Sequence, residues 1–249
     1  MLRVTFVHHS CFVVEMDRSV LIFDYFPKGD LNGYVFTGEL PEFPADKAVY
    51  VFASHAHKDH FDLEILKWAG NYPNIRYILS KDIRLGKNYL ARNGIDGRIK
   101  EKITFVSPCE KYTVGETEIR TLRSTDAGVA FLVKAEEKYI YHAGDLNLWK
   151  WEGAGDLING KETRSYQHEI KKLIPYNIEV AFVPLDPRLE QHAELGMDFF
   201  MKNVNAKYVF PMHMWQDYSI LERYLSRISN PMFSGRIAEV TGENEVFEL

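Results

Sequence analysis

The sequence holds three histidines and one aspartate within six residues, in the run from His55 to His60 that reads H-A-H-K-D-H. This run directly follows Ala48 to Ala53, an apolar stretch whose composition predicts a buried strand. Because sites in layered folds form where strands end, the run is expected to lie at a sheet edge. In an extended backbone His55 and His57 project to the same side, whereas Asp59 can turn towards a second point. The run therefore predicts a metal centre with room for two ions.

Imidazole nitrogens and carboxylate oxygens are ligands that Zn²⁺ accepts, and such a site with open positions is more typical of hydrolysis than of a structural role. A structural zinc knuckle needs cysteines, and the only cysteines are Cys11 and Cys109, far from the run and from each other. Their separation also argues against a disulfide framework. We therefore expect a reducing cytoplasm as the setting.

Strand and helix patterns alternate along the chain, and neither an internal repeat nor a low-complexity linker divides them. The predicted strands are Arg3–Val7, Cys11–Glu15, Val20–Asp24, Ala48–Ala53, Arg76–Leu79, Ile103–Val106, Glu118–Arg123, Val129–Lys134, Lys138–His142, Val180–Val183 and Tyr208–Phe210. The predicted helices are His60–Trp68, Ile83–Arg92, Glu194–Asn203 and Ser219–Ile228. This order predicts an α+β fold with two sheet-and-helix layers, in one domain over residues 1–249.

One long connection, from Gly144 to Gln167, contains three glycines and is predicted to be irregular. Loops of this length are more often functional than idle. Trp149 and Trp151 stand at its start, where they are expected either to wall a pocket or to pack. Trp149 is retained as a candidate substrate contact.

The run His55 to His60 matches the H-x-H-x-D-H signature of the metallo-β-lactamase-fold superfamily. Two later segments, Tyr141–Asp145 and Pro211–His213, resemble the glycine-aspartate motif and the late histidine of that family, in the same order. The resemblance spans nearly the whole chain. It implies a four-layer αβ/βα sandwich, in which two mixed β-sheets are flanked by helices.

The same resemblance implies a set of metal ligands. His55 and His57 would hold one ion, and the other ion would be held by Asp59, His60 and His213. The carboxylate of Asp145 would bridge the two, because cations about 3.5–4 Å apart repel unless anionic oxygens lie between them. Asp59 and Asp145 are then the expected catalytic carboxylates.

This sequence departs from the family at one ligand. Members usually supply another histidine to the first ion from a loop before a mid-chain strand, and that loop here, Arg123 to Gly128, has none. Asp126 is the best substitute by chemistry, although an aspartate near glycine is also a common turn former. The first ion is therefore expected to bind weakly, to be absent or to be one that prefers oxygen.

The segments Val7–Phe12 and Ile22–Asp24 resemble more narrowly the branch that includes ascorbate-6-phosphate lactonase. Asp24 ends an apolar strand and is placed to accept a hydrogen bond from the second nitrogen of a ligand histidine, unless it is a plain cap. His8 and His9 alternate across a strand, so only one of them can face the site. The family pattern favours His9, either as a metal ligand or as a residue that contacts a ligand.

Arg188 follows the apolar run Val180–Leu185, another strand end that should open on the same face. A guanidinium there is suited to an anionic group of the substrate, although a solvated loop arginine is equally typical. His142, in the strand before Asp145, is expected either to pack in the core or to lie behind the ligands.

Composition excludes several other functions. The net charge is -5 and the basic residues form no stripe, which argues against nucleic-acid binding. No uninterrupted apolar run approaches the roughly 20 residues of a membrane-spanning helix, and the N-terminal residues lack the pattern of a secretion signal. A nucleophile elbow, a P-loop and a dinucleotide fingerprint are also missing. A small-molecule substrate is expected.

The predicted function is metal-dependent hydrolysis of a small ester, lactone or phosphodiester by metal-activated water. The expected cofactor is one or two Zn²⁺ ions, with Mn²⁺ or Fe²⁺ as alternatives. An iron-bearing oxidoreductase on the same fold is a second candidate, but di-iron members usually carry a glutamate at the position of His57. A binding or regulatory protein that has lost turnover is a third. The sequence leaves the oligomeric state open.

Overall fold

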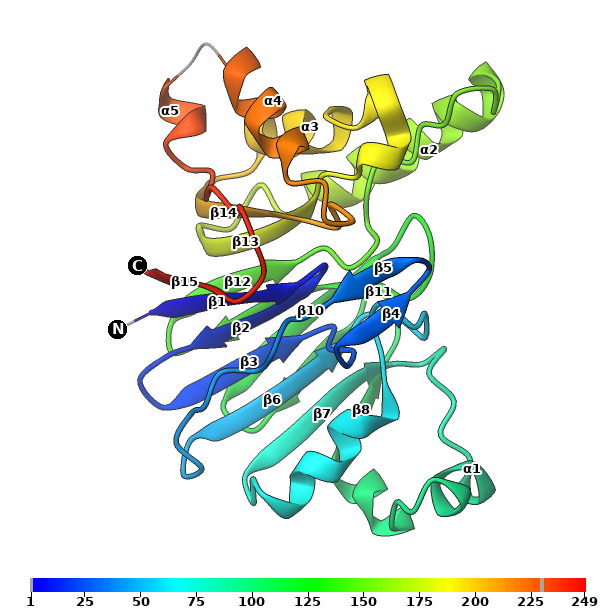
Figure 1. Ribbon diagram of the computed structural model, residues 1–249, viewed down its shortest axis with the longest axis vertical. Coiled ribbons are helices and arrows are strands. Elements are labelled where there is room, and N and C mark those ends of the chain that lie inside the picture. Colours follow the sequence, from blue (N-terminus) through cyan, green and yellow to red (C-terminus); the bar gives the residue numbers. More distant parts are fainter. Residues whose placement is uncertain (1, 229–230) are drawn as a thin grey trace.

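The computed structural model describes residues 2–228 and 231–249. Two mixed β-sheets pack face to face, with helices on their outer sides (Figure 1). The first sheet has seven strands in the order β15 (Glu245–Glu248), β1 (Arg3–His8), β2 (Cys11–Glu15), β3 (Ser19–Phe23), β6 (Ala48–Ala53), β7 (Ile75–Ser80) and β8 (Ile103–Val106). The second has six, in the order β14 (Ala206–Met212), β13 (Ile178–Pro184), β12 (Lys138–His142), β11 (Val129–Ala135), β10 (Thr117–Arg123) and β9 (Lys111–Val114).

Helices cover the outer face of each sheet (Figure 1). The second sheet is covered by α2 (Asp156–Lys171), α3 (Leu195–Asn203), α4 (Ser219–Arg227) and the short α5 (Pro231–Ser234). The first is covered by α1 (Lys87–Arg92) and the 3₁₀ segments Leu63–Gly70 and Gly97–Lys102. The predicted α+β sandwich is confirmed. Among the described residues, no helix is both long and apolar enough to cross a membrane.

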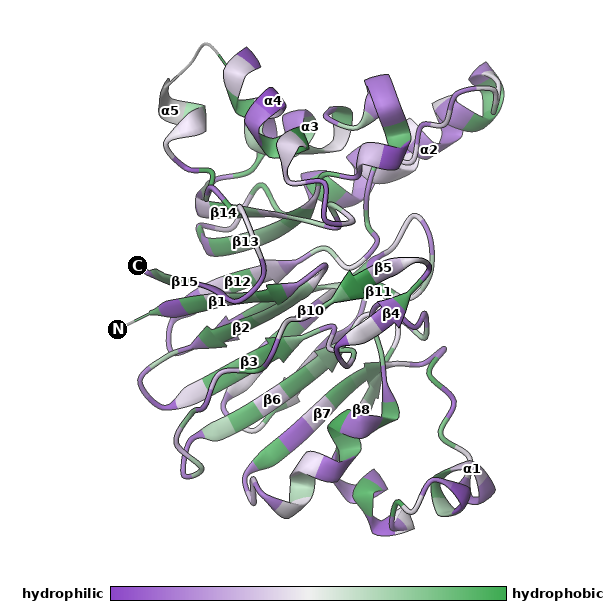
Figure 2. Cartoon of the chain, in the orientation of Figure 1, coloured by the Kyte–Doolittle hydropathy of each residue, from purple (hydrophilic) through white to green (hydrophobic). Residues whose placement is uncertain are grey.

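Strand alternation builds the core, because successive side chains point to opposite faces. On β2, Phe12 belongs to the cluster between the sheets, whereas Val13 belongs to the cluster under the outer helices. The two sheets meet through aromatic rings, with Phe12 and Phe182 4.2 Å apart between centroids. Figure 2 shows the hydrophobic residues concentrated on the strands, with hydrophilic residues along the helices. This rigid double layer supports the loops at its edges.

Two predicted helices begin later than expected. The turn from His60 to Phe61 is not helical, and the 3₁₀ segment starts only after Asp62, whose side chain accepts a hydrogen bond from the Glu64 N–H. The helix predicted from Ile83 begins at Lys87. The first delay has a local reason: the end of the run is a tight turn, in which the His60 and Phe61 N–H groups both donate to the His57 carbonyl at 3.0 Å, so the 3₁₀ segment begins only after it.

The prediction of an irregular connection from Gly144 to Gln167 is wrong over its second half. Helix α2 begins at Asp156, and only residues 144–155 form a loop. Its buried residues are Asn159, Tyr166, Glu169 and Ile170, two of them strongly polar, so no apolar period was visible. Gly160 in its second turn further obscured the helix.

Strands β9 and β15 and the hairpin of β4 (Gly29–Leu31) with β5 (Tyr34–Phe36) were also not predicted. They are short, with three or four residues each, too few to show a clear alternation of apolar and polar side chains. The hairpin lies over the edge of the sandwich where the metal-ligand run is found (Figure 1).

Candidate metal centre

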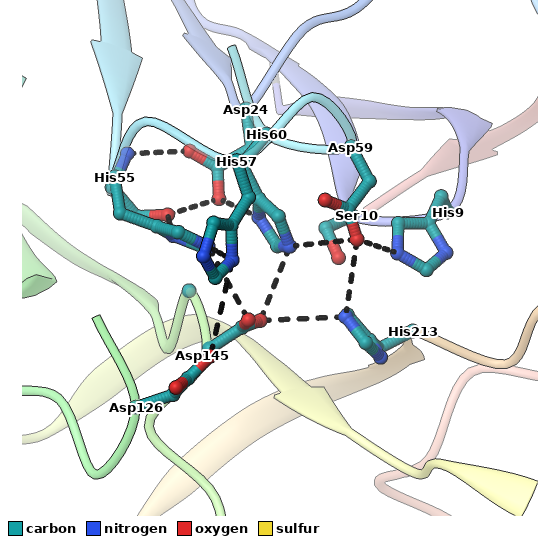
Figure 3. Close-up of polar contacts among 12 residues, drawn as sticks. His9, Ser10, Asp24, His55, His57, Asp59, His60, Asp126, Asp145 and His213 are labelled. Atoms are coloured by element: carbon teal, nitrogen blue, oxygen red, sulfur yellow. Dashed lines mark hydrogen bonds and ion pairs between the residues drawn. The ribbon is translucent and has the colours of Figure 1, made fainter. Parts of the chain in front are cut away.

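The candidate site lies at one edge of the sandwich, where strands from both sheets end. Strands β3, β6 and β7 are parallel in the first sheet, as are β12, β13 and β14 in the second, so their carboxyl ends meet at the same edge. The site residues follow these strands, β1 or β10: His9 after β1, Asp24 after β3, the run from His55 after β6, Asp126 after β10, Asp145 after β12, Asp186 after β13 and His213 after β14. Residues far apart in sequence thus converge (Figure 3).

Two groups of side chains could each hold a metal ion. The group that we call the inner set consists of His9, Asp59, His60 and His213. Its three Nε2 atoms lie around one oxygen, Oδ2 of Asp59, at 3.4 Å from His9, 3.6 Å from His60 and 3.8 Å from His213. The three imidazoles are buried.

The outer set consists of His55, His57, Asp126 and Asp145. Nε2 of His55 lies 2.9 Å from Nδ1 of His57, and this Nδ1 lies 3.9 Å from Oδ2 of Asp126. The side chains of His57 and Asp126 are about half exposed, at 54% and 49%. The loop Arg123–Gly128, which lacks the expected histidine, therefore brings Asp126 to the outer set instead.

Asp145 faces both sets (Figure 3). Its Oδ2 lies 3.3 Å from Nε2 of His55, on the outer side. Its Oδ1 lies 3.1 Å from Nε2 of His60 and 3.4 Å from Nε2 of His213, on the inner side. One oxygen towards each set is the arrangement that a bridging carboxylate requires.

The inner residues fit a bound cation. Nε2 of His60, Nε2 of His213, Oδ1 of Asp145 and both ring nitrogens of His9 are buried without a hydrogen-bond partner among the described residues. Unsatisfied buried polar atoms are costly, and here several converge on one point. Four ligands held about 2.05 Å from a tetrahedral Zn²⁺ lie about 3.3 Å from one another, close to the separations above.

Asp24 orients histidines of both sets. Its Oδ1 accepts from the Ser54 N–H at 2.7 Å, and its Oδ2 accepts from Nδ1 of His60 at 2.8 Å and from the Ser54 hydroxyl at 2.6 Å. The Ser54 oxygen in turn lies 2.9 Å from Nδ1 of His55. Because both Nδ1 atoms then carry the proton, Nε2 of each ring is left free to bind metal. Sequence analysis anticipated the bond to one histidine but not the relay through Ser54.

Asp186 does the same for His213, and sequence analysis missed it. Its Oδ2 lies 2.9 Å from Nδ1 of His213 and also accepts from the guanidinium of Arg188, which stacks 4.7 Å over the ring of Trp215. The signal was available, since Asp186 ends an apolar strand as Asp24 does. The sequence analysis assigns a role at this strand end to Arg188 and none to Asp186.

Close backbone contacts hold the loops together. A Cβ at Gly144 would lie 2.6 Å from Cβ of Ser54, and one at Gly128 would lie 2.0 Å from the Ser54 carbonyl oxygen. Both glycines have positive φ, and so do His9, Asp24 and His213. A non-glycine residue with a positive φ costs about 1–3 kcal/mol in backbone strain, and such strain is common at functional sites.

The metal-free site carries ionised carboxylates, a neutral His9, and a His60 whose pKa neighbouring carboxylates raise against the effect of burial. Burial lowers the pKa of His9 to about 3, so that its ring is neutral at physiological pH. Burial opposes the ionisation of Asp59, but His9 and the neighbouring imidazoles hold its pKa below the usual range. For Asp186, hydrogen bonds from His213 and Arg188 outweigh burial and lower the pKa to about 2. Carboxylates and neutral rings are the forms that bind cations.

A cavity of about 490 Å³ opens onto the site. Its lining includes His57, Asp59, Asp126, Asp145, Arg188, His213, Trp215 and Lys58. A neighbouring cavity of about 790 Å³ shares Leu31, Ala56 and Lys58 with it. Substrate therefore has access to the outer set and to one edge of the inner set.

The structure brings together the predicted ligands, including Asp126 and His9, and places Arg188 in the cavity wall. Of the two roles expected for Trp149, the structure shows packing. It is 8% exposed, its indole N–H donates to the Asp145 carbonyl at 2.9 Å, and it is not among the described residues that line the cavity. Trp215, which sequence analysis did not single out, lines the cavity instead.

His142 lies behind the ligands and also packs. Its ring stacks 4.9 Å from Phe23, its Nε2 lies 2.9 Å from the Ser10 carbonyl oxygen, and its Nδ1 accepts from the Gly144 N–H at 3.1 Å. Both readings of this residue thus hold, because it fixes the turn that carries Asp145.

Comparison with known proteins identifies the family. The model of the beta-lactamase superfamily domain matches residues 3–213. The metal-dependent hydrolase YtkL of Bacillus subtilis is 24% identical, and the alignment covers 100% of both chains. The solved structure of Igni18, a metallo hydrolase from Ignicoccus hospitalis, has a TM-score of 0.63 at 16% identity over 100% of this chain and 99% of that one. A possible metal-dependent hydrolase from Veillonella parvula gives 0.61 at 13%, over 100% of both.

At these identities the solved structures establish the fold alone. The family match extends from β1 to the late histidine and so includes both ligand sets. The relatives' names and the two sets together support a metal cofactor. The chain belongs to the beta-lactamase superfamily and is a hydrolase with the metallo-β-lactamase fold.

Proposed function

We propose that this hydrolase uses two zinc ions to cleave a small ester, lactone or phosphodiester that carries an anionic group. The observation that carries the proposal is the position of Asp145, with one oxygen towards each of two complete ligand sets. With a single ion, the ligand atoms of one set would hold no metal.

The donor atoms favour zinc. Each set combines imidazole nitrogens with carboxylate oxygens, and no cysteine belongs to either set among the described residues. Such borderline donors suit Zn²⁺, whereas a carboxylate-rich set would suit Mn²⁺ or Mg²⁺ better. A histidine, His57, stands where di-iron members of the family usually carry a glutamate, which weighs against the iron-bearing oxidoreductase.

We assign the ligands of the outer ion to His55, His57 and Asp126, and those of the inner ion to Asp59, His60 and His213, with Asp145 between them. Zinc in such a site polarises a carbonyl or phosphoryl oxygen and acidifies water. Asp59 and Asp145 are ionised, with Asp59 facing the inner set and Asp145 facing both sets, so they would orient the attacking water and serve as the catalytic carboxylates.

The cavity wall accounts for the choice of an anionic substrate. Arg188 is held by three contacts of its Nε and Nη2 with Asp186 and by stacking on Trp215. These contacts preorganise the guanidinium, and its remaining N–H groups are available to a carboxylate or phosphate. Lys58 lines the same cavity and adds a second positive charge.

The proposed setting is the cytoplasm, with a small molecule as the partner and no nucleic acid. Both cysteines are free, with Cys11 buried and Cys109 exposed. An exposed free thiol stays reduced in the cytoplasm, whereas an oxidising compartment favours disulfide formation.

Elemental analysis of the purified protein, together with hydrolysis of bis(p-nitrophenyl) phosphate, a p-nitrophenyl ester and a γ-lactone, tests this proposal. Two zinc ions per chain and activity on at least one substrate are expected. The variant His57→Ala should lose the outer ion and activity, and Asp145→Ala should lose metal and activity, while both stay folded. His168→Ala, which removes an exposed histidine of α2, is the matched control and should change neither. A metal-free protein, or full activity in both site variants, would refute the proposal.

A further inference from the structure

We infer that the two ions are held unequally: His9 supplies an additional nitrogen to the inner ion, which is retained, whereas the outer ion exchanges with solvent. This inference rests on the two-ion function proposed above. It assigns a direct role to His9, and it predicts different lifetimes for two ions that share Asp145.

His9 is aimed into the inner set and cannot easily turn away. Its Nε2 lies 3.4 Å from Oδ2 of Asp59, the oxygen around which the inner set is arranged. Its ring centroid lies 4.2 Å from that of His213 and 4.5 Å from that of Trp215, so neighbouring rings fix its orientation. The backbone is tied as well, because the His9 carbonyl accepts from the His213 N–H at 3.1 Å.

The adjacent residue, His8, shows what a histidine of this segment does when it only packs. His8 is equally buried, but its Nε2 lies 3.0 Å from the Phe26 carbonyl oxygen, and its ring packs at a tilt against that of Phe26, with centroids 4.3 Å apart. It belongs to neither ligand set. His9, in contrast, has no hydrogen-bond partner at either ring nitrogen among the described residues. A cation explains a buried imidazole whose Nε2 has no hydrogen-bond partner and lies beside three other ligand atoms.

The inner set also excludes water better than the outer set. The side chains of His9, His60 and His213 are at most 2% exposed, and that of Asp59 is 16% exposed. In the outer set His57 and Asp126 are about half exposed and both line the open cavity. Release of an ion requires water to replace its ligands one at a time, so the exposed set should exchange faster.

The donor count points the same way. With Asp145 shared, the inner set offers three imidazoles and Asp59, whereas the outer set offers two imidazoles and Asp126. Zinc binds imidazole nitrogen strongly, and each additional ligand must be displaced before the ion leaves. Relative to the family pattern described above, the outer ion has lost one histidine and the inner ion has gained one.

The test measures zinc release from the full chain loaded with two zinc ions, using a chromogenic chelator in excess. We expect two phases of one ion each, with rates that differ by at least about tenfold. His57→Ala should remove the fast phase and leave the slow one. His9→Phe, which keeps an aromatic ring but no nitrogen, should accelerate the slow phase by about tenfold or more. His8→Phe is the matched control and should leave both phases unchanged.

Because His9 has a positive φ, phenylalanine there could impair folding. His9→Asn is therefore measured in parallel, since asparagine tolerates this conformation and is too short to reach the ion. Circular dichroism checks the fold of both variants. Release of both ions from the native protein at one rate, or an unchanged slow phase in a folded His9 variant, would overturn the inference. A native protein that binds no zinc would instead refute the proposed function.

Discussion

Replacing Asp24 with asparagine separates the orientation of the ligands from their presence. The carboxylate is fully buried and accepts three hydrogen bonds, two from Ser54 and one from Nδ1 of His60. An asparagine has nearly the same shape, but one of its two terminal atoms is a donor. The substitution therefore leaves every proposed ligand in place and changes only the hydrogen-bond pattern behind them.

Either orientation of the amide conflicts with this pattern. If the NH₂ takes the place of Oδ1, it faces the Ser54 N–H, and two donors meet in a buried position. If it takes the place of Oδ2, Nδ1 of His60 must accept, and the proton of the ring moves to Nε2, the nitrogen that faces Asp145. A protonated Nε2 cannot bind the inner ion.

The magnitude follows from the bond that is lost. A hydrogen bond to a charged group contributes about 1.5–3 kcal/mol, which corresponds to about 10- to 150-fold in zinc affinity. Competitive titration with a chromophoric chelator measures this change. Asp96→Asn is the matched control: Asp96 also accepts three hydrogen bonds, all from Arg98, but at an exposed site, and its substitution should leave the affinity unchanged. Native zinc affinity in a folded Asp24→Asn variant would refute this account of the orientation.

Three further predictions concern packing, substrate and pH. Gly144→Ala should destabilise the protein by about 1 kcal/mol or more beyond Gly153→Ala in thermal unfolding, because both glycines have positive φ but only Gly144 has an atom within 3 Å of the new Cβ; equal losses would contradict the close approach to Ser54. Arg188→Lys keeps the charge but loses the paired contacts with Asp186. KM for an anionic ester should therefore rise about tenfold, while KM for a matched neutral ester changes little. Parallel changes in both KM values would exclude recognition of the anionic group by Arg188. The pKa of Asp186 lies at about 2, below its usual 3.8. Its contribution of roughly 2 kcal/mol to the stability of the metal-free protein is therefore present above pH 3.8 and is lost as pH falls towards 2. The free energies of urea unfolding of the native protein and of Asp186→Asn should converge in acid, and a constant difference would show that another group carries the effect.

Most strands of both sheets were predictable because the pattern that specifies them is local. Strands β2, β6, β8 and β12 have the predicted bounds, since apolar and β-branched residues within each stretch decide its burial. Helix α2 failed the same test, because its buried face holds Asn159 and Glu169 and its stability depends on the neighbouring α3. A polar helix that packs on other elements has no strong signature of its own.

The sequence alone determined the run His55 to His60 and, through its order with Asp145 and His213, the family and its chemistry. Only the tertiary structure decided which other side chains join them. It brought Asp126 to the place of the missing histidine, turned His9 rather than His8 towards the inner set, and put Trp215 rather than Trp149 in the cavity wall. These outcomes depend on how strand ends from two sheets meet across the sandwich. A motif consists of residues that are close together along the chain, so it can be read from the sequence. The completion of each ligand set depends on contacts between residues up to some two hundred positions apart, such as His9 and His213.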